Sequence, residues 1–253
     1  MVYQYIKCEK IDKVALIEIT ASVDNQNRFI ELADELTEIC ADVAAERESR
    51  VMILEGIREG IFWENVEPEF LCAGDIGQRY SLAQPIAKMD LPVIAAIRGD
   101  AAGHGLELAL ACDLRIATGA SHFGFPHIQK GFIPRDGGTQ RLSRLVGRSK
   151  ALEMILTGEM IDAQEAYRIG LVNKIISSED LMTVVIKMAQ EMASKAPFSL
   201  KYAKEAIYKG MDLTLEQGLR LEADLYFLLH TMKDRTEGIQ AFRGKRIPRF
   251  EGK

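Results

Sequence analysis

The residues best suited to chemistry lie in a glycine-rich turn and in the apolar segment that follows it. The turn, residues 99–105, reads GDAAGHG, and Glu107 is the one charge in the apolar stretch 106–112. Three glycines in seven residues permit backbone conformations that are closed to other residues and let a ligand approach closely. If the apolar stretch is a helix, its free N–H groups point out of the turn at the positive end of the helix dipole. Such groups could stabilise a carbonyl oxygen that becomes an enolate.

Glu107 would lie one or two residues inside this helix, beside the predicted anion site. A carboxylate on an apolar helix next to an oxyanion pocket can act as a general base. The alternative is that Glu107 only complements the helix dipole at a surface N-terminus. The spacing alone leaves both interpretations open.

Short apolar segments on both sides would hold the turn and the helix in place. Residues 92–97 (PVIAAI) are almost wholly apolar, which is the pattern of a strand buried on both faces, and residues 113–118 return to a strand pattern. Further elements are expected upstream: a hairpin of residues 3–8 and 14–20, a helix after the turn signal at 24–27, and a buried strand at 50–56. Pro85 should divide any helix within residues 76–89.

The C-terminal part of the chain should be mostly helical from residue 178 onward, with one helix beginning at Pro197 and another at residues 212–217. This second helix carries many leucines: Leu219, Leu221, Leu225, Leu228 and Leu229. That surplus favours burial against other subunits. Packing of the same leucines onto the core of their own chain is the alternative, and both interpretations stay open.

Composition limits the class of protein. The 253 residues suit one large domain or a core with an appendage, and the net charge of −5 gives no basic field for nucleic acid. The four cysteines lie tens of residues apart without metal-binding spacing, so we expect reduced thiols rather than disulfides. We see no N-terminal targeting signal and no run near the roughly 20 apolar residues of a membrane helix. We therefore expect a soluble, cytoplasmic protein that binds neither nucleic acid nor membrane.

Several motifs, in this order, resemble the crotonase (enoyl-CoA hydratase/isomerase) superfamily. They are LCAGDI (71–76), PVIAAIRGDAAGHGLELALACDLRIAT (92–118), FGFPHIQKGFIPRDGGTQRLSRLVG (123–147), ALEMILTGEMIDAQEAYRIGLVNKI (151–175) and EGIQAFRGKRIPRF (237–250). The resemblance implies the α/β crotonase fold, a spiral of ββα units over residues 1–195. It also implies a helical region over residues 196–253 that serves oligomerisation and CoA contact. The expected assembly is a homotrimer or a homohexamer built as a dimer of trimers.

The resemblance also assigns binding roles. The backbone N–H groups of Asp75 and His104 would form the oxyanion hole for the thioester oxygen. Ala73, Phe242 and Lys245 match positions that contact CoA, in the last two cases often from a neighbouring subunit. Asp75 departs from the family pattern, in which a small residue is common, and its carboxylate could cap a helix that starts at Ile76. The imidazole of His104 could also lie at the substrate pocket.

The most informative departure from the family is His127, because hydratases of the family have a glutamate at that position, the second of two catalytic carboxylates. A neutral imidazole can accept a proton from water, and an imidazolium can donate one. The alternative is a structural histidine, with Glu107 working alone. Asp136 is a candidate acid, since some relatives place an acid in this loop. It could instead cap the next helix or pair with Arg135, Arg141 or Arg144.

These assignments predict an acyl-CoA lyase that hydrates an α,β-unsaturated acyl-CoA through a thioester enolate, with a cyclic or otherwise unusual enoyl- or dienoyl-CoA as one option. No metal or redox cofactor is implied, because CoA is part of the substrate. An isomerase that needs only Glu107, a decarboxylase or hydrolase, and a non-catalytic CoA-binding or assembly subunit are the alternatives. Residues 57–70, with the only tryptophan, Trp63, are either a surface loop or a flap over the acyl pocket.

Overall fold

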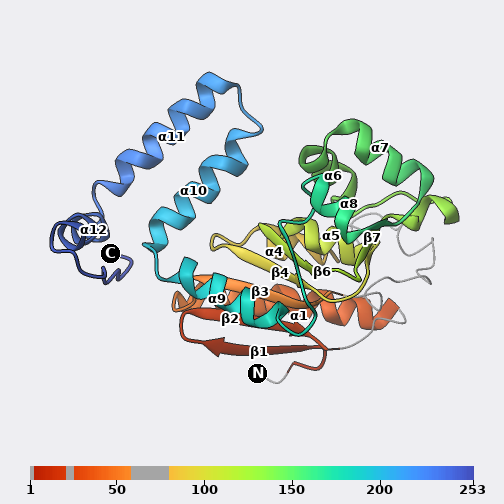
Figure 1. The fold of residues 1–253 in the computed structure, drawn as a ribbon, viewed down its shortest axis with the longest axis horizontal. Helices are drawn as coiled ribbons and strands as arrows, with labels where there is room; N and C mark the ends of the chain where they lie inside the picture. Colours follow the sequence, from red (N-terminus) through yellow and green to blue (C-terminus); the bar gives the residue numbers. More distant parts are fainter. Residues whose placement is uncertain (1–2, 21–25, 58–79) are drawn as a thin grey trace.

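The computed structural model describes residues 3–20, 26–57 and 80–253 (Figure 1). The expectations for Trp63, Ala73 and Asp75 therefore lie outside the described residues. No helix within the described ranges is long and apolar enough to cross a membrane.

A six-stranded sheet with the order β1-β2-β3-β4-β6-β9 forms the centre of the protein. Its strands are β1 (Ile6–Ile11), β2 (Val14–Ile19), β3 (Val51–Ile57), β4 (Val93–Ile97), β6 (Leu114–Thr118) and β9 (Lys174–Ile176). The first two pair as an antiparallel hairpin, as the sequence predicts, and from β2 onward neighbouring strands run parallel. Parallel strands are buried on both faces, which explains why residues 51–54 of β3 and all of β4 are apolar.

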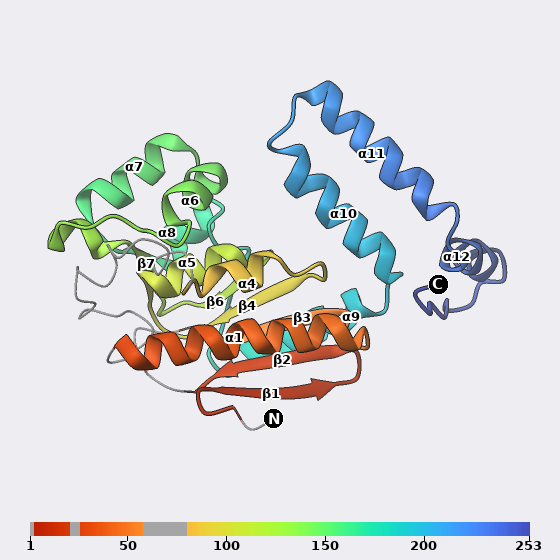
Figure 2. The same ribbon diagram turned by 180° about the vertical axis from the view of Figure 1, so that it is seen from behind.

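Two helices cover the two faces of this sheet (Figures 1 and 2). Helix α1 (Gln26–Glu46) shares one apolar cluster with Met52 and Leu54 of β3, whereas α9 (Leu181–Ala193) shares another with Val51 and Ile53. Side chains alternate between the faces of a strand, so one apolar run supplies both clusters. The alternation fixes the register of β3, because a slip of one residue would exchange its two faces.

A smaller three-stranded sheet, with the order β5-β7-β8, lies beside a group of short helices. The strands are β5 (Ala101–Ala102), β7 (His122–Gly124) and β8 (Ile161–Asp162). The helices are α4 (Ala83–Ala87), α5 (His104–Ala111), the 3₁₀ helix η2 (Pro126–Lys130), α6 (Gly138–Val146), α7 (Arg148–Thr157) and α8 (Ala163–Arg168). The prediction that Pro85 divides any helix here was wrong, because Pro85 lies in the first turn of α4, where a missing N–H removes no intrahelical bond.

The chain ends in three helices, α10 (Pro197–Gly210), α11 (Leu215–Leu229) and α12 (Lys233–Arg243). Helices α10 and α11 form a hairpin that stands away from the sheet in both views (Figures 1 and 2). Of the five leucines on α11, only Leu225 is buried, while Leu219 and Leu228 are exposed. Within one chain these leucines therefore do not pack together onto their own core. The expected division into residues 1–195 and 196–253 stays a prediction.

Helix α10 is tied to the core by a largely buried ion pair. The Nζ atom of Lys204 lies 2.7 Å from Oδ2 of Asp113 and also donates to the carbonyl oxygen of Leu91 at 2.9 Å. The same Asp113 oxygen accepts the backbone N–H of Val93, the first residue of β4, at 2.7 Å. The pair therefore joins α10 to the beginning of two central strands.

Replacing Lys204 with Met should lower the free energy of unfolding by about 1–3 kcal/mol, because it leaves the Asp113 carboxylate without its charged partner. Urea unfolding followed by circular dichroism measures this loss. The matched control on the same helix is Lys201→Met, whose pair with Asp90 is more exposed and should contribute only about 0–1 kcal/mol. Equal losses in the two variants would show that burial of the Lys204 pair does not matter.

Candidate active site

The N-terminus of α5 is shaped by Gly103, which takes φ 55° and ψ −122°, a conformation that glycine adopts readily. Its N–H donates to the carbonyl oxygen of Gly124 in β7 at 3.0 Å, and its own carbonyl oxygen accepts the N–H of Glu107 at 3.0 Å. The helix begins at His104, two residues earlier than predicted. As the first helical residue, His104 has a backbone N–H without an intrahelical partner, as an oxyanion donor requires.

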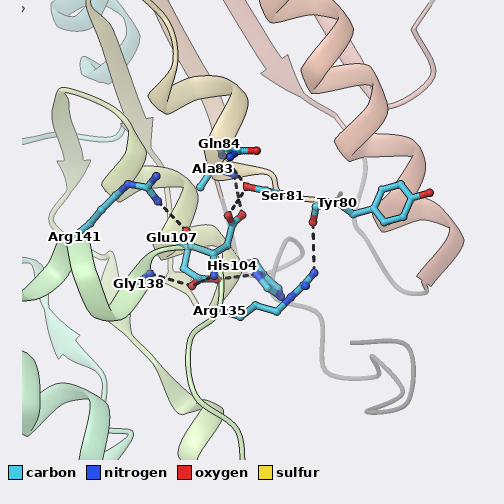
Figure 3. Close-up of polar contacts among 10 residues, drawn as sticks. Tyr80, Ser81, Ala83, Gln84, His104, Glu107, Arg135, Gly138 and Arg141 are labelled. Atoms are coloured by element: carbon cyan, nitrogen blue, oxygen red, sulfur yellow. Dashed lines mark hydrogen bonds and ion pairs between the residues drawn. The ribbon is translucent and has the colours of Figure 1, made fainter. Parts of the chain in front are cut away.

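Glu107 lies in the first turn of α5 and is completely buried. The interpretation of Glu107 as a surface carboxylate was therefore wrong. Its Oε1 atom accepts the backbone N–H of Asp136 at 2.6 Å and that of Gly138 at 3.1 Å (Figure 3). Its Oε2 atom lies 2.8 Å from Nδ1 of His104. One oxygen is thus fixed by two main-chain donors, and the other faces an imidazole.

Two opposing influences act on the ionisation of Glu107. Burial raises the pKa of this carboxyl group, but the ring of His104, the ring of His127 and the backbone N–H of Asp136 outweigh burial, so the pKa lies below its ordinary value. The carboxylate is the form that can receive a proton.

His104 contributes its side chain to the site, which the sequence left open, as well as its main-chain N–H. Its side chain is buried, with its ring centroid 5.1 Å from that of Phe29 in α1. Its ring meets that of His127 edge-on, with centroids 5.9 Å apart. His104 and Glu107 are three residues apart on one helix. This spacing could have revealed the contact between their side chains once the helix start was known.

His127 lies in η2, whose first residue is Pro126 and whose C-cap is Gly131 with φ 79°. The imidazole is half-buried, and burial lowers the pKa of His127 to about 4 although Glu107 acts in the opposite direction. The structure brings this ring together with His104 and Glu107: one ligand atom from each of the three lies within 4.8 Å of the others. A largely neutral imidazole beside a carboxylate can hold or accept a proton from a water molecule.

The side chain of Asp136 binds the start of α4 and so ties the loop before α6 to that helix. Its Oδ2 atom accepts the backbone N–H of Ala83 at 2.9 Å, and its Oδ1 atom accepts the hydroxyl of Ser81 (Figure 3). The alternative that Asp136 caps the helix after it was therefore wrong, because its carboxylate binds the start of α4 and the N-cap of α6 is Gly137. The side chain of Arg141 donates to the carbonyl oxygen of Asp136 at 2.8 Å.

Burial raises the pKa of the Asp136 carboxyl, the bonds from Ser81 and Ala83 lower it, and Glu107 raises it again, with a net rise. This direction is compatible with an acid, but the direct contacts of the carboxylate are with α4. A catalytic role for Asp136 stays a prediction.

Gly138 is a site residue that sequence reasoning did not single out. A Cβ atom at this position would lie 3.0 Å from Oε1 of Glu107, 2.8 Å from the ring of Phe125 and 2.7 Å from Pro134. Only glycine lets the main chain come close enough to donate to the carboxylate. The pair Gly137-Gly138 at the start of α6 was the available signal.

The predicted CoA contacts on and just after the last helix are not brought to Glu107 within one chain. Phe242, near the end of α12, is almost fully exposed, and Lys245 follows it with φ 48°. Figures 1 and 2 place α12 at the end of the molecule away from α5. Ala73 and Asp75 lie outside the described residues, so the second predicted oxyanion donor stays a prediction.

Comparison with known proteins identifies the family. The model of the enoyl-CoA hydratase/isomerase family matches residues 12–253. A crotonyl-CoA hydratase of Syntrophomonas wolfei is 35% identical over the whole of both chains, and a putative enoyl-CoA hydratase/isomerase of Bacillus subtilis is 38% identical over 96% of each. The crystal structure of an enoyl-CoA hydratase from Bacillus anthracis superposes with a TM-score of 0.86 at 35% identity, covering 99% of this chain and 100% of that one.

The structural likeness confirms the predicted crotonase fold, an α/β core followed by a helical C-terminal region. The matches span both the glycine turn with Glu107 and the C-terminal helices. The chain therefore belongs to the enoyl-CoA hydratase/isomerase, or crotonase, family and is an enzyme of its hydratase-like lyase type.

Proposed function

We propose that this enzyme adds water to the double bond of an α,β-unsaturated acyl-CoA, and catalyses the reverse dehydration, through a thioester enolate. The observation that carries the proposal is the buried Glu107 carboxylate, with Oε1 held by two backbone N–H groups and Oε2 beside His104. Relatives named as hydratases, such as the crotonyl-CoA hydratase of Syntrophomonas wolfei, support the reaction class.

In the proposed mechanism, Oε2 of Glu107 takes a proton from a water molecule that His127 orients. The hydroxyl oxygen bonds to the β-carbon, and the electron pair of the double bond moves onto the thioester oxygen. The N–H groups of His104 and Asp75 stabilise the resulting enolate. Glu107 then returns its proton to the α-carbon, so that one water molecule has been added and the enzyme is unchanged.

The same site could also shift a double bond between carbons, because isomerisation needs one base that moves one proton. Glu107, with Oε1 held by the N–H groups of Asp136 and Gly138, would be that base. In that case His127 would only shape the pocket. The response of turnover to changes at His127 separates the two reactions.

We propose further that CoA enters as part of the substrate and that Phe242 and Lys245 contact the CoA bound by a neighbouring copy. Their exposure on and after α12, away from the Glu107 of their own chain, supports this arrangement. A homotrimer, or a dimer of trimers, would also cover the exposed leucines of α11.

Replacing Glu107 with Gln should reduce turnover of crotonyl-CoA by at least about 10²–10⁴-fold, because the amide keeps the shape of the side chain but cannot accept the proton. Loss of absorbance of the enoyl thioester measures turnover. Binding of 3-hydroxybutyryl-CoA by calorimetry serves as the control and should persist. Full activity in this variant contradicts the mechanism.

Replacing His127 with Ala should lower kcat by about 10²-fold or more if the imidazole orients water. The matched control is His122→Ala, which removes an exposed ring paired with Asp100 at 2.9 Å, outside the site. A retained kcat in His127→Ala, together with double-bond migration, would favour the isomerase.

Replacing Gly138 with Ala should lower kcat and destabilise the fold by about 1–3 kcal/mol, because the added methyl group crowds Oε1 of Glu107 and the ring of Phe125. The control is Gly210→Ala, since a Cβ at that helical position meets nothing within 4 Å. Steady-state kinetics and thermal unfolding report the two effects. Equal behaviour of the two variants would remove the role assigned to Gly138.

A further inference from the structure

Three side chains that meet beside the N-terminus of α5 are of the kinds that bind metal ions. His104, Glu107 and His127 each offer one ligand atom, and these atoms all lie within 4.8 Å of one another. It is the one group of three or more such side chains found among the described residues. Two imidazoles and one carboxylate form a donor set that suits Zn²⁺ and other divalent transition metals.

The two most buried ligand atoms face each other as a close pair whose geometry is poor for a hydrogen bond. Nδ1 of His104 and Oε2 of Glu107 lie 2.8 Å apart, with side-chain exposures of 6% and 0%. Within the described part of the chain, neither atom makes a hydrogen bond of acceptable geometry. Buried polar atoms normally have well-aligned partners, and a cation bound by both atoms would give each of them one.

The carboxylate is also held in the way that metal ligands usually are. The N–H groups of Asp136 and Gly138 bind Oε1, so Oε2 is the oxygen left for a ligand. Such outer contacts fix the orientation of ligands and increase metal affinity. The hydrogen bonds that would orient the Glu107 ligand are therefore already present.

The distances between the ligand atoms are close to those around a bound zinc ion. Ligand atoms on a tetrahedral Zn²⁺ lie about 3.3 Å apart, given bonds of about 2.0–2.1 Å. The His104–Glu107 pair is slightly closer than this, and no separation in the group exceeds 4.8 Å. A bound ion would draw the three atoms to about 2.0–2.1 Å from itself. His127 is the most exposed of the three residues, so the ion would enter and keep an exchangeable ligand on its side.

We propose that His104, Glu107 and His127 bind a divalent transition metal ion, with Zn²⁺ as the main example, and that the bound ion blocks hydration. Metal binding follows from the arrangement of the donors alone. The block rests on the proposed function, because the ion would occupy the Oε2 atom that takes the proton from water. The site would make the enzyme sensitive to the concentration of free Zn²⁺.

The test titrates the full-length protein, treated with chelator and then freed of it, with Zn²⁺ by calorimetry and with Co²⁺ by visible absorption. We expect one ion per chain. His127→Ala, His104→Ala and Glu107→Gln should each weaken binding by at least about tenfold, since even outer partners of metal ligands contribute about 10–100-fold. The chain has four histidines, so His122→Ala and His230→Ala are the controls and should bind as the parent does. His127 is half-buried, so its variant carries the test if His104→Ala does not fold.

Two results would overturn the site: absence of binding by the parent protein, or loss of binding in His122→Ala with retention in His127→Ala, which would place the ion at the exposed Asp100–His122 pair. The block is tested separately by turnover of crotonyl-CoA, which Zn²⁺ should abolish and excess chelator restore. Unchanged or increased turnover with one Zn²⁺ bound contradicts the block. If the metal-free protein turns over no enoyl-CoA but still binds Zn²⁺ through these residues, the proposed function fails and the metal site stands.

Discussion

The carboxylate of Glu107 has no contact with solvent, and this burial is the constraint that the surrounding structure has to meet. Removing a carboxylate from water costs several kcal/mol unless hydrogen bonds and opposite charge compensate for it. Here the compensation comes from two backbone N–H groups on one oxygen and an imidazole beside the other. The two N–H groups come from residues 136–138 and the imidazole from α5 itself, so two separate parts of the chain must be placed correctly for one side chain.

The N–H donors come from the loop before α6, and that loop is in turn held by α4. Asp136 uses its backbone N–H for Glu107 and its carboxylate for Ser81 and Ala83. Gly138 lacks the Cβ that would strike the carboxylate. A residue that resembles a catalytic acid in the sequence therefore contacts the base through its main chain and α4 through its side chain. This arrangement leaves Oε2 of Glu107 facing His104.

Local signals in the sequence predicted the parts of the site that lie within one segment. The glycine turn, the helix after it and the position of Glu107 follow from composition and spacing over fewer than fifteen residues. The apolar runs of β3 and β4 likewise predicted strands covered on both faces. Resemblance to the family added His127, whose place beside Glu107 could not be inferred from its own segment.

Contacts between distant segments were beyond such reasoning. Ala83 and Asp136 are 53 positions apart. Only the folded chain shows that the Asp136 carboxylate accepts the backbone N–H of Ala83, the first residue of α4. The contact of the His104 ring with Glu107 was missed because the start of α5 was expected two residues later, which hid the i,i+3 spacing of the two residues. The exposed leucines of α11 show the limit in another way, since apolar periodicity predicts a buried face but does not say which chain covers it.

The most direct measurement of the central claim is turnover in heavy-oxygen water, analysed by mass spectrometry, with crotonyl-CoA, a 3-enoyl-CoA and a cyclic dienoyl-CoA as substrates. If Glu107 and His127 act on water, the parent protein will incorporate one heavy oxygen into a hydroxyacyl-CoA product from at least one of these thioesters. Migration of the double bond without uptake of heavy oxygen would contradict the account and leave Glu107 as the lone base of an isomerase.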